Sequence, residues 1–398
     1  MGTPTVPSGG SPLVARMRGF GTTIFAEMSA LAGETGAINL GQGFPDTDGP
    51  REMLEAAKAA IDGGRNQYPP GPGVPELLEA VAAHQERFYG LRLDPRTEVL
   101  VTVGATEAIA ASVLALCEPG DEVVTFEPYY DSYAATIALA GAVRRTSVLR
   151  FPDFAVDEES LRAAFSDRTR LVLLNTPHNP TGKVFTRAEL ELVCSLAREH
   201  DAWVVTDEVY EHLLFDGLEH VPVATLPGMA ERTLTISSAG KTFSATGWKV
   251  GWVTGPAEAV AAVRTVKQFL TYVGSGPFQP AVALALGLGD DVYAAMATSL
   301  QAKRDLLVAG LRSAGLEVSV PSGTYFVVAN AAPLGATDGL EFCRRLPSLA
   351  GVVGVPVSVF HDDVEAARTL VRFAFCKRDE VLAEAVGRLS RAGRGARA

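Results

Sequence analysis

RLVLLNTPHNPTGKVFTRAELELVCSLAREHDAWVVTD, residues 170–207, contains the pattern that decides the fold. Two short apolar runs, at 170–175 and 202–207, enclose a stretch at 187–200 whose apolar residues recur at intervals of three and four. Continuous apolar runs are typical of strands buried on both faces, and the three-and-four interval is typical of a covering helix. The stretch therefore predicts a strand, a helix and a second, parallel strand.

Apolar runs of the same kind continue on both sides of this unit. Further strands are expected at 98–103, 121–126, 232–237, 250–255, 324–330 and 369–377, and a further covering helix is expected at 106–117. Strands that alternate with helices in this way indicate an α/β fold with a mainly parallel sheet flanked by helices.

The order of these patterns predicts three parts. Residues 1–45 are expected to form an N-terminal tail and arm, 46–285 a large ligand-binding domain, and 286–398 a smaller α+β domain against which the arm packs. The segment 267–280 is expected to begin a long helical region that runs toward Ala314.

The composition favours a small-molecule partner. The chain has 398 residues, enough for two domains, and a formal net charge of −11. Nucleic acids and anionic membranes select clustered Lys and Arg, so we expect neither as a partner. No apolar run approaches the roughly 20 residues of a membrane span, and the Pro/Gly/Ser-rich N-terminus lacks an apolar signal core, which favours a cytoplasmic location. The basic C-terminal tail, RLSRAGRGARA, is interpreted as a solvated end.

The cysteines predict neither a metal site nor a disulfide framework. They are far apart and form no C-x-x-C pair. We expect buried thiols that act as small apolar residues at Cys117, Cys194, Cys343 and Cys376.

The stretch SSAGKTFSATGWKVGW, residues 237–252, raises the question of what Lys241 does. A phosphate-binding P-loop is disfavoured, because that motif needs glycine five positions before Gly240 and the chain has Thr235 there. Ser238 and Lys241 match the S-x-x-K motif of serine acyl-enzymes, but the partner strings K-T-G and S-D-N do not occur. Two interpretations remain, a lysine in a solvated loop and a Schiff-base lysine that holds pyridoxal phosphate.

Polar groups follow the predicted strands in the places where a pyridoxal phosphate site needs them. In an open α/β sheet the ligand lies beyond the carboxyl ends of the strands. Residues 104–106 would open a helix whose free N–H groups suit a phosphate. Asn175 and Asn179 follow one strand, and Asp207 and Lys241 follow two others. The strand ends therefore favour the second interpretation.

Seven motifs, taken in order, carry a resemblance to a known family. They are NLGQGFPD, NQYPPGPG, EPYYDSY, NTPHNPTGKVF, TDEVYEHL, RTLTISSAGKTFSATGWKVGW and RFAFCKRDE. The chain resembles the class I aminotransferases of pyridoxal phosphate fold type I over roughly 18–389. Within them it is similar to the kynurenine aminotransferase and glutamine transaminase K group and to actinobacterial N-succinyldiaminopimelate aminotransferases. The resemblance implies a seven-stranded sheet, pyridoxal phosphate as cofactor, amino acid and 2-oxo acid substrates, and a homodimer with shared active sites.

The resemblance also implies a role for each matching residue. Lys241 would hold the cofactor and move the substrate proton, Asp207 would keep the pyridine nitrogen protonated, and Arg372 would grip the substrate α-carboxylate opposite Gly43. The further contacts implied are Ala105, Thr106, Ser238 and Lys249 at the phosphate, Tyr68 from a neighbouring subunit, Tyr130 against the ring, Asn179 and Tyr210 at the phenolic oxygen, and Phe25 near the substrate.

Structural alternatives stay open for several of these residues. Asp207 could instead cap a helix, Arg372 could instead pair with an acidic residue of the small domain, and Tyr68 could be an aromatic staple in its Pro-rich loop. Tyr129 and Tyr133 are near enough to Tyr130 in sequence to leave the choice of stacking residue open.

The identity of the substrate side chain also stays open. An aromatic-lined pocket for kynurenine, phenylalanine, methionine or glutamine could be built from Phe25, Tyr68, Tyr130, Phe278 and Tyr325. A succinylated diaminopimelate would instead need a cation for its distal carboxylates, for which Arg16 and Arg18 are candidates.

Two other classes of function compete with transamination. A pyridoxal-phosphate-dependent carbon–sulfur β-lyase would use the same lysine and aspartate. The effector domain of a transcription regulator shares this fold, but it is expected to follow a basic helix-turn-helix region, which the short N-terminal segment does not offer.

Overall fold

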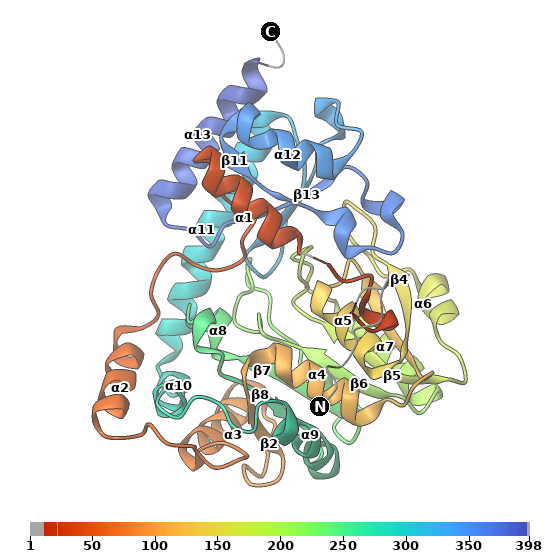
Figure 1. Ribbon diagram of the computed structural model, residues 1–398, viewed down its shortest axis with the longest axis vertical. Helices are drawn as coiled ribbons and strands as arrows, with labels where there is room; N and C mark the ends of the chain where they lie inside the picture. Colours follow the sequence, from red (N-terminus) through yellow and green to blue (C-terminus); the bar gives the residue numbers. More distant parts are fainter. Residues whose placement is uncertain (1–11, 22, 396–398) are drawn as a thin grey trace, which may run out of the picture.

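The protein is described by a computed structural model that covers residues 12–21 and 23–395 (Figure 1). Residues 1–11 and the last three residues of the basic tail, both included in the predictions above, lie outside this part of the chain. Figure 1 shows α12 (Gly339–Ala350) and α13 (Asp379–Gly395) at one end of the molecule, and α3 (Pro75–Tyr89) and α9 (Ala257–Leu270) at the other.

A seven-stranded sheet forms the centre of the larger part. Its strands lie in the order β2 (Val99–Thr102), β8 (Gly251–Thr254), β7 (Thr233–Ser238), β6 (Trp203–Asp207), β5 (Thr169–Asn175), β3 (Glu122–Glu127) and β4 (Val143–Val148). Neighbours from β7 to β4 pair in parallel, whereas β8 is antiparallel to both β7 and β2. The fold is therefore the predicted α/β fold with a mainly parallel sheet.

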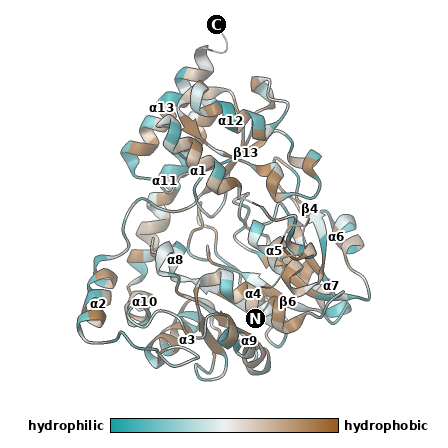
Figure 2. Ribbon diagram, viewed as in Figure 1, coloured by the Kyte–Doolittle hydropathy of each residue, from teal (hydrophilic) through white to brown (hydrophobic). Residues whose placement is uncertain are grey.

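Helices cover the large sheet because each of them has one apolar side. The covering and flanking helices are α2 (Arg51–Asp62), α3, α4 (Gly104–Leu116), α5 (Asp131–Ala140), α6 (Glu158–Ala164), α7 (Arg187–Glu199), α9 and α10 (Phe278–Leu286). In α7, the predicted helix, the Thr186 side chain accepts from the backbone N–H of Glu189, whose carboxylate accepts from the Thr186 N–H. Figure 2 shows hydrophobic and hydrophilic residues within the same helices, as helices that separate a core from solvent require.

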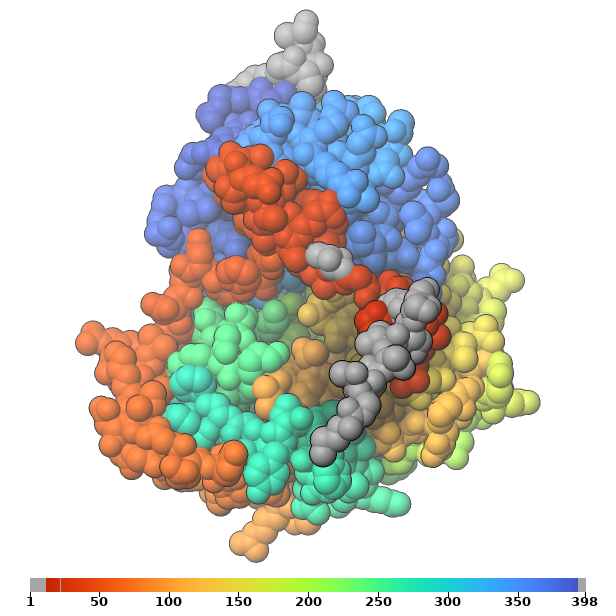
Figure 3. Space-filling view, viewed as in Figure 1, coloured from red at the N-terminus to blue at the C-terminus, as the bar shows by residue number. Residues whose placement is uncertain are grey.

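The smaller part contains a four-stranded antiparallel sheet. Its order is β12 (Val355–Pro356), β13 (Leu370–Ala374), β10 (Phe326–Asn330) and β9 (Glu317–Ser319). The N-terminal helix α1 (Ile24–Thr35) packs on α12, and β1 (Ile38–Asn39) pairs in parallel with β11 (Val352–Val353). Figure 3 shows this N-terminal segment in red lying against the blue C-terminal residues. The exact boundaries predicted for the three parts remain a prediction.

The structure differs in detail from the sequence-based prediction in two segments. The strand β4 was not among the expected strands, because VRRTSV lies at the sheet edge, is partly exposed and has no continuous apolar run. The helical region predicted to run toward Ala314 is present but is divided into separate helices, and the segment 267–280 is not helical throughout. It contains the end of α9, a connection with Gly274, Gly276 and Pro277, and the start of α10, which is followed by the separate helix α11 (Asp290–Ala314).

The structure also bears on membrane-spanning segments and on the cysteines. None of the described helices is by itself long and apolar enough to span a membrane. Only α10 and α11 taken together meet the requirements of length and composition, with a 92° bend between them. All four cysteines are buried and none is in a disulfide. The cytoplasmic location stays a prediction.

Candidate active site

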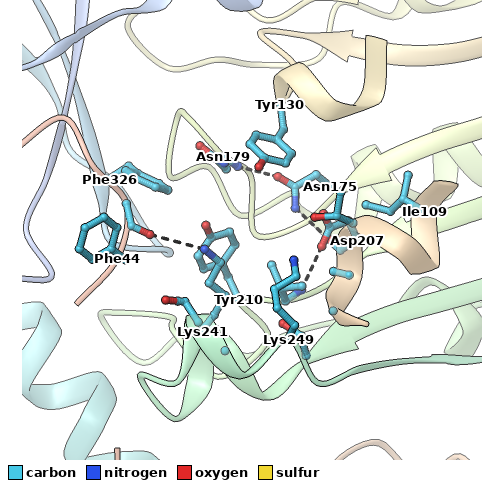
Figure 4. Close-up of a pocket in the computed structure, with 18 of the residues that line it drawn as sticks. Phe44, Ile109, Tyr130, Asn175, Asn179, Asp207, Tyr210, Lys241, Lys249 and Phe326 are labelled. Atoms are coloured by element: carbon cyan, nitrogen blue, oxygen red, sulfur yellow. Dashed lines mark hydrogen bonds between the residues drawn. The ribbon is translucent and has the colours of Figure 1, made fainter. Parts of the chain in front are cut away.

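A cavity of about 230 Å³ lies at the carboxyl ends of β5, β6 and β7. All of the predicted site residues except Tyr68 line it, namely Phe25, Gly43, Ala105, Thr106, Tyr130, Asn179, Asp207, Tyr210, Ser238, Lys241, Lys249 and Arg372. Figure 4 shows several of these side chains converging from separate strands and loops. The rule that ligands bind beyond the carboxyl ends of parallel strands accounts for this convergence.

Lys241 lies in the short helix α8 (Ala239–Thr242), directly after β7. Its Nζ lies 3.5 Å from the carbonyl oxygen of Gly43 and 5.8 and 5.6 Å from the ring centroids of Tyr210 and Tyr325 (Figure 4). Burial lowers the pKa of Lys241 to about 8, although Asp207 opposes the shift. About a tenth of the amine is therefore neutral at pH 7, far more than for an ordinary lysine, and the neutral form is the one that a nucleophile or general base requires.

Asp207 ends β6 and is buried, with 5% of its surface exposed. It accepts hydrogen bonds from the Tyr133 hydroxyl at 2.6 Å and from the Val209 N–H at 3.3 Å. Burial raises the pKa of Asp207, while these hydrogen bonds and Lys241 oppose that rise. A buried carboxylate with these partners is suited to hold a cationic N–H, such as a protonated pyridine nitrogen.

The three neighbouring tyrosines point in different directions. Tyr130 lines the cavity, Tyr133 donates to Asp207, and Tyr129 donates to Asp362 at 2.8 Å. The geometry therefore favours Tyr130 for the stacking position and adds Tyr133 as a partner of the buried carboxylate. Sequence alone did not distinguish them, because all three belong to the single motif EPYYDSY.

One end of the cavity has the features of a phosphate site. Helix α4 begins at Gly104, so the N–H groups of Ala105 and Thr106 lie in its unpaired first turn. Gly104 has a φ of +72°, and a Cβ there would lie 3.1 Å from the Lys249 Nζ. A Cβ on Gly251 would lie 2.6 Å from the Gly104 carbonyl carbon. Both glycines therefore let β8 and the start of α4 approach closely enough to bring Lys249 to the cavity.

Arg372 lies on β13, opposite Val328 of β10, and only 1% of its surface is exposed. Its Nη1 donates to the Asn179 Oδ1 at 3.1 Å and its Nη2 donates to the Gly41 carbonyl at 2.7 Å. Among the described residues the Arg372 Nε has no hydrogen-bond partner. Burial lowers the pKa of Arg372 to about 10. Arg372 thus forms no ion pair with an acidic residue of the described chain. Its guanidinium is therefore free to bind the carboxylate of a ligand.

The aromatic lining differs from the one expected. Phe25 and Tyr130 line the cavity as predicted, and they are joined by Phe44 and Phe326. Three other aromatic residues expected there lie elsewhere. Tyr68 is 80% exposed, the ring of Phe278 stacks on Trp248, and Tyr325 donates to the Gly43 carbonyl and lines a separate cavity beyond Lys241. No strand-end rule points to Phe44 or Phe326, so neither residue was predicted to line the cavity.

Asn175 organises the loop that carries Asn179. It ends β5, its Nδ2 donates to the Asp207 carbonyl at 2.8 Å, and its Oδ1 accepts from the Asn179 N–H at 2.7 Å (Figure 4). The side-chain oxygen of Asn179 is thereby held next to Arg372. The order Asn175, Asn179 in a proline-punctuated loop was the sequence signal for this arrangement.

A polar cluster behind the cavity has the residue types of a metal site. Ligand atoms of His84, Glu211 and His212 lie within 4.8 Å of one another. The two histidine rings share a hydrogen bond of 2.7 Å, and the Glu211 carboxylate accepts from Ser237 at 2.5 Å. Burial lowers the pKa of His212 to about 4, so its ring stays neutral at neutral pH. The cluster is held by its own hydrogen bonds, and the prediction of no metal stays a prediction.

The residues present fit pyridoxal phosphate. They offer an amine for covalent attachment, a buried carboxylate for the pyridine nitrogen, and a helix N-terminus with a lysine for the phosphate. This fold and this donor set define a pyridoxal-phosphate-dependent transferase of fold type I.

Comparison with known proteins identifies the family. The family model "Aminotransferase class I and II" matches residues 35–389, so the chain belongs to the class I and II aminotransferases and depends on pyridoxal phosphate. The chain is 55% identical to the probable N-succinyldiaminopimelate aminotransferase DapC of Mycobacterium tuberculosis, with 95% of this chain and 98% of that protein covered. It is 39% identical to kynurenine–oxoglutarate transaminase 3 of Mus musculus, over 92% of this chain and 87% of the relative.

A solved structure agrees with these relatives. The methionine aminotransferase of Escherichia coli superposes with a TM-score of 0.92 at 41% identity, over 98% of this chain and all of that one. The predicted enzyme class, aminotransferase, is therefore confirmed, and none of these relatives supports the lyase alternative.

Proposed function

We propose that the protein is a homodimeric aminotransferase whose preferred amino donor is an L-amino acid with a long, uncharged side chain, such as methionine or kynurenine. Three cationic side chains line the cavity among the described residues, and each has a task in this proposal. Lys241 exchanges with the substrate amine, Lys249 binds the cofactor phosphate, and Arg372 binds the α-carboxylate. No further cation among the described lining residues remains for a distal carboxylate, and this observation carries the proposal.

The positions of these groups support a ping-pong transfer. Bound pyridoxal phosphate supplies an electron sink for the carbon that loses its proton. Arg372 and Asn179 fix the α-carboxylate and thereby orient the Cα–H bond toward the Lys241 amine. The Lys241 amine would act as the general base that takes the Cα proton and would then give the proton back as the general acid. Asp207 would hold the protonated pyridine nitrogen. One water molecule would release the first 2-oxo acid product, and a second 2-oxo acid such as 2-oxoglutarate would then accept the amino group.

The apolar wall beside the reacting carbon limits bulk water there, while one water molecule must still enter to release the 2-oxo acid product. Phe25 comes from α1, Phe44 from the following connection and Phe326 from β10, so the apolar wall is built from three segments. Dry surroundings strengthen the contacts of Arg372 and Asp207 with their charged partners.

N-succinyldiaminopimelate is the second candidate donor. The 55% identity to a protein of that printed activity favours it, and a cation for its distal carboxylates would then have to come from outside the lining of one chain. The dimer offers such a source, because a partner subunit brings its own side chains to a shared site.

Exposed aromatic residues support the dimer. Tyr68, Phe269 and Tyr272 are 80%, 82% and 56% exposed, and the rings of Tyr68 and Tyr272 are in contact at 5.4 Å. Large exposed aromatic side chains that lie together are typical of a protein interface. We propose that Tyr68 reaches the phosphate site of the partner subunit across this interface.

The test is the visible spectrum of the purified holoenzyme during titration with methionine, kynurenine, glutamine and N-succinyl-LL-diaminopimelate. The donor that removes the cofactor absorption with the highest second-order rate constant is the preferred substrate, and an added 2-oxo acid must restore the absorption. A higher rate constant for the succinylated donor than for methionine and kynurenine would overturn the proposed substrate class. Release of pyruvate from a cysteine conjugate without an amino acceptor would revive the lyase alternative.

A further inference from the structure

Lys267 is a buried lysine that the catalytic proposal does not use. It lies in the last turn of α9 and only 1% of its surface is exposed. Its Nζ donates to the Tyr272 carbonyl at 2.8 Å and to the Gly71 carbonyl at 3.1 Å. Burial lowers its pKa, while the nearby Glu107 opposes the shift. A buried ammonium is costly unless its hydrogen bonds are kept, so the two carbonyls must stay close to it.

The two carbonyls belong to two loops that are far apart in the sequence. Gly71 lies in the Pro/Gly-rich loop that also contains Tyr68, and Tyr272 lies in the connection between α9 and α10. The ring of Tyr272 meets the ring of Tyr68 edge to face at 5.4 Å, with an interplanar angle of 76°. Lys267 therefore ties together the loop of Tyr68 and the connection of Tyr272, whose rings form the only ring contact of Tyr68 among the described residues.

Two further contacts attach the Tyr68 loop to this connection and to the start of α10, which follows it. The side-chain oxygen of Gln279 accepts from the Val74 N–H at 2.9 Å, where the loop enters α3. A Cβ on Gly276 would lie 2.8 and 3.1 Å from the carbonyl oxygens of Arg65 and Gln67, so the two backbones are packed directly on each other. The loop is thus held before and after Tyr68 by one segment, and Lys267 lies at the start of that segment.

Glu107 fixes this segment to the rest of the large sheet. One of its carboxylate oxygens accepts from the Thr271 hydroxyl, and the other accepts from the Val103 N–H at 2.6 Å. Val103 directly precedes α4, whose first turn is the phosphate end of the cavity. The lysine, the connection and the start of α4 consequently form one hydrogen-bonded unit.

We propose that Lys267 is a positioning residue that fixes Tyr68 for the active site of the partner subunit, so that its substitution impairs the opposite site rather than its own. The inference rests on the proposed dimer with a shared Tyr68. Lys267 touches neither substrate nor cofactor in this proposal, and it acts through the Gly71 and Tyr272 carbonyls.

Mixed dimers test this proposal. One subunit carries Lys241→Ala and is inactive, so all turnover comes from the intact lysine of the other subunit. Two differently tagged chains allow the mixed dimer to be purified. Lys267→Met is placed either in the inactive subunit, which supplies Tyr68 to the working site, or in the working subunit itself. The measured quantities are kcat, KM and the dissociation constant of pyridoxal phosphate.

Lys267→Met in the inactive subunit is expected to weaken pyridoxal phosphate binding at the working site about tenfold, because a charged hydrogen-bonded tie is lost. The same substitution in the working subunit is expected to change the dissociation constant of pyridoxal phosphate at the working site by less than about twofold. An equal effect from both placements, or a larger effect from the working subunit, would overturn the inference. Lys58→Met, which removes an exposed lysine of α2, is the matched control and is expected to change none of the three measured quantities.

Two further variants keep the outcomes distinguishable. Tyr68→Phe in the same format tests the shared site itself. If it acts from the working subunit, the proposed sharing fails, whereas an effect of Tyr68→Phe from the inactive subunit without one from Lys267→Met overturns only the inference. Gln279→Leu removes a separate tie of the same loop and replaces Lys267→Met if the latter does not fold. It is expected to act from the inactive subunit as well.

Discussion

Replacement of Arg372 by lysine tests how this enzyme selects amino acids. The guanidinium is held by the Asn179 side chain and the Gly41 carbonyl, and its carbon lies 4.0 Å from the centroid of the Phe326 ring. A lysine keeps the positive charge but has no planar fork, so it forms only one of the two parallel hydrogen bonds to a carboxylate. Loss of one charged hydrogen bond costs about 2 kcal/mol, which corresponds to about 30-fold in kcat/KM.

The assay is the single-turnover reaction of the holoenzyme with methionine, followed by the loss of cofactor absorption. Arg372→Lys is expected to lower the second-order rate constant about 30-fold and to leave pyridoxal phosphate affinity unchanged, because Arg372 lies at the substrate end of the cavity. Arg162→Lys on α6, an exposed arginine paired with Glu158, is the control. A primary amine with the methionine side chain but no carboxylate should react equally with the wild-type enzyme and with Arg372→Lys. A loss below about threefold with methionine, or an equal loss with the amine, would refute this role of Arg372.

Three other changes are expected to have measurable effects. Asp207→Asn should lower kcat about 100-fold or more, because the amide does not balance the charge of a protonated pyridine nitrogen. A cofactor analogue methylated at that nitrogen should restore part of the loss. Because burial lowers the pKa of Lys241 to about 8, the rate of cofactor uptake by the apoenzyme should rise with pH up to about 8 and then level off. With an unperturbed amine, the uptake rate would continue to rise until the pH approached 10.5. The unfolded chain binds more protons at Lys241 between these two values, so apoenzyme stability from this group should rise with pH in that window and not in Lys241→Met. Gly251→Ala should weaken pyridoxal phosphate binding at least about tenfold and lower Tm, since the added Cβ lies 2.6 Å from the backbone of Gly104. Unchanged affinity and Tm would show that the start of α4 moves without cost.

The central sheet and the residues that follow its strands were predictable, because both depend on local pattern. Continuous apolar runs marked β5 and β6, and the polar residues at their carboxyl ends or in the loops that follow included Asp207 and Asn179. The edge strand β4 escaped prediction because only one of its six residues is buried.

The substrate side of the cavity was harder to predict, because it is assembled from parts distant in sequence. Phe44 and Phe326 meet at the cavity through the packing of the smaller sheet against the N-terminal connection, and no sequence spacing records that packing. Arg372 also donates to the Gly41 carbonyl, a contact across the two parts of the chain that no local pattern indicates. The helix break after α9 also depended on tertiary packing, since Gly276 faces the carbonyls of Arg65 and Gln67.

The reversed strand β8 has a consequence for how the cofactor and the polypeptide hold each other. Because β8 runs against β7, the residues between them leave the sheet and return at the same edge, so Lys241 and Lys249 belong to one short excursion of the chain. Pyridoxal phosphate bound by both lysines would connect the two ends of that segment and so restrict their separation. Amide hydrogen exchange within 239–250 should therefore quicken more than that of neighbouring strands when the cofactor is removed.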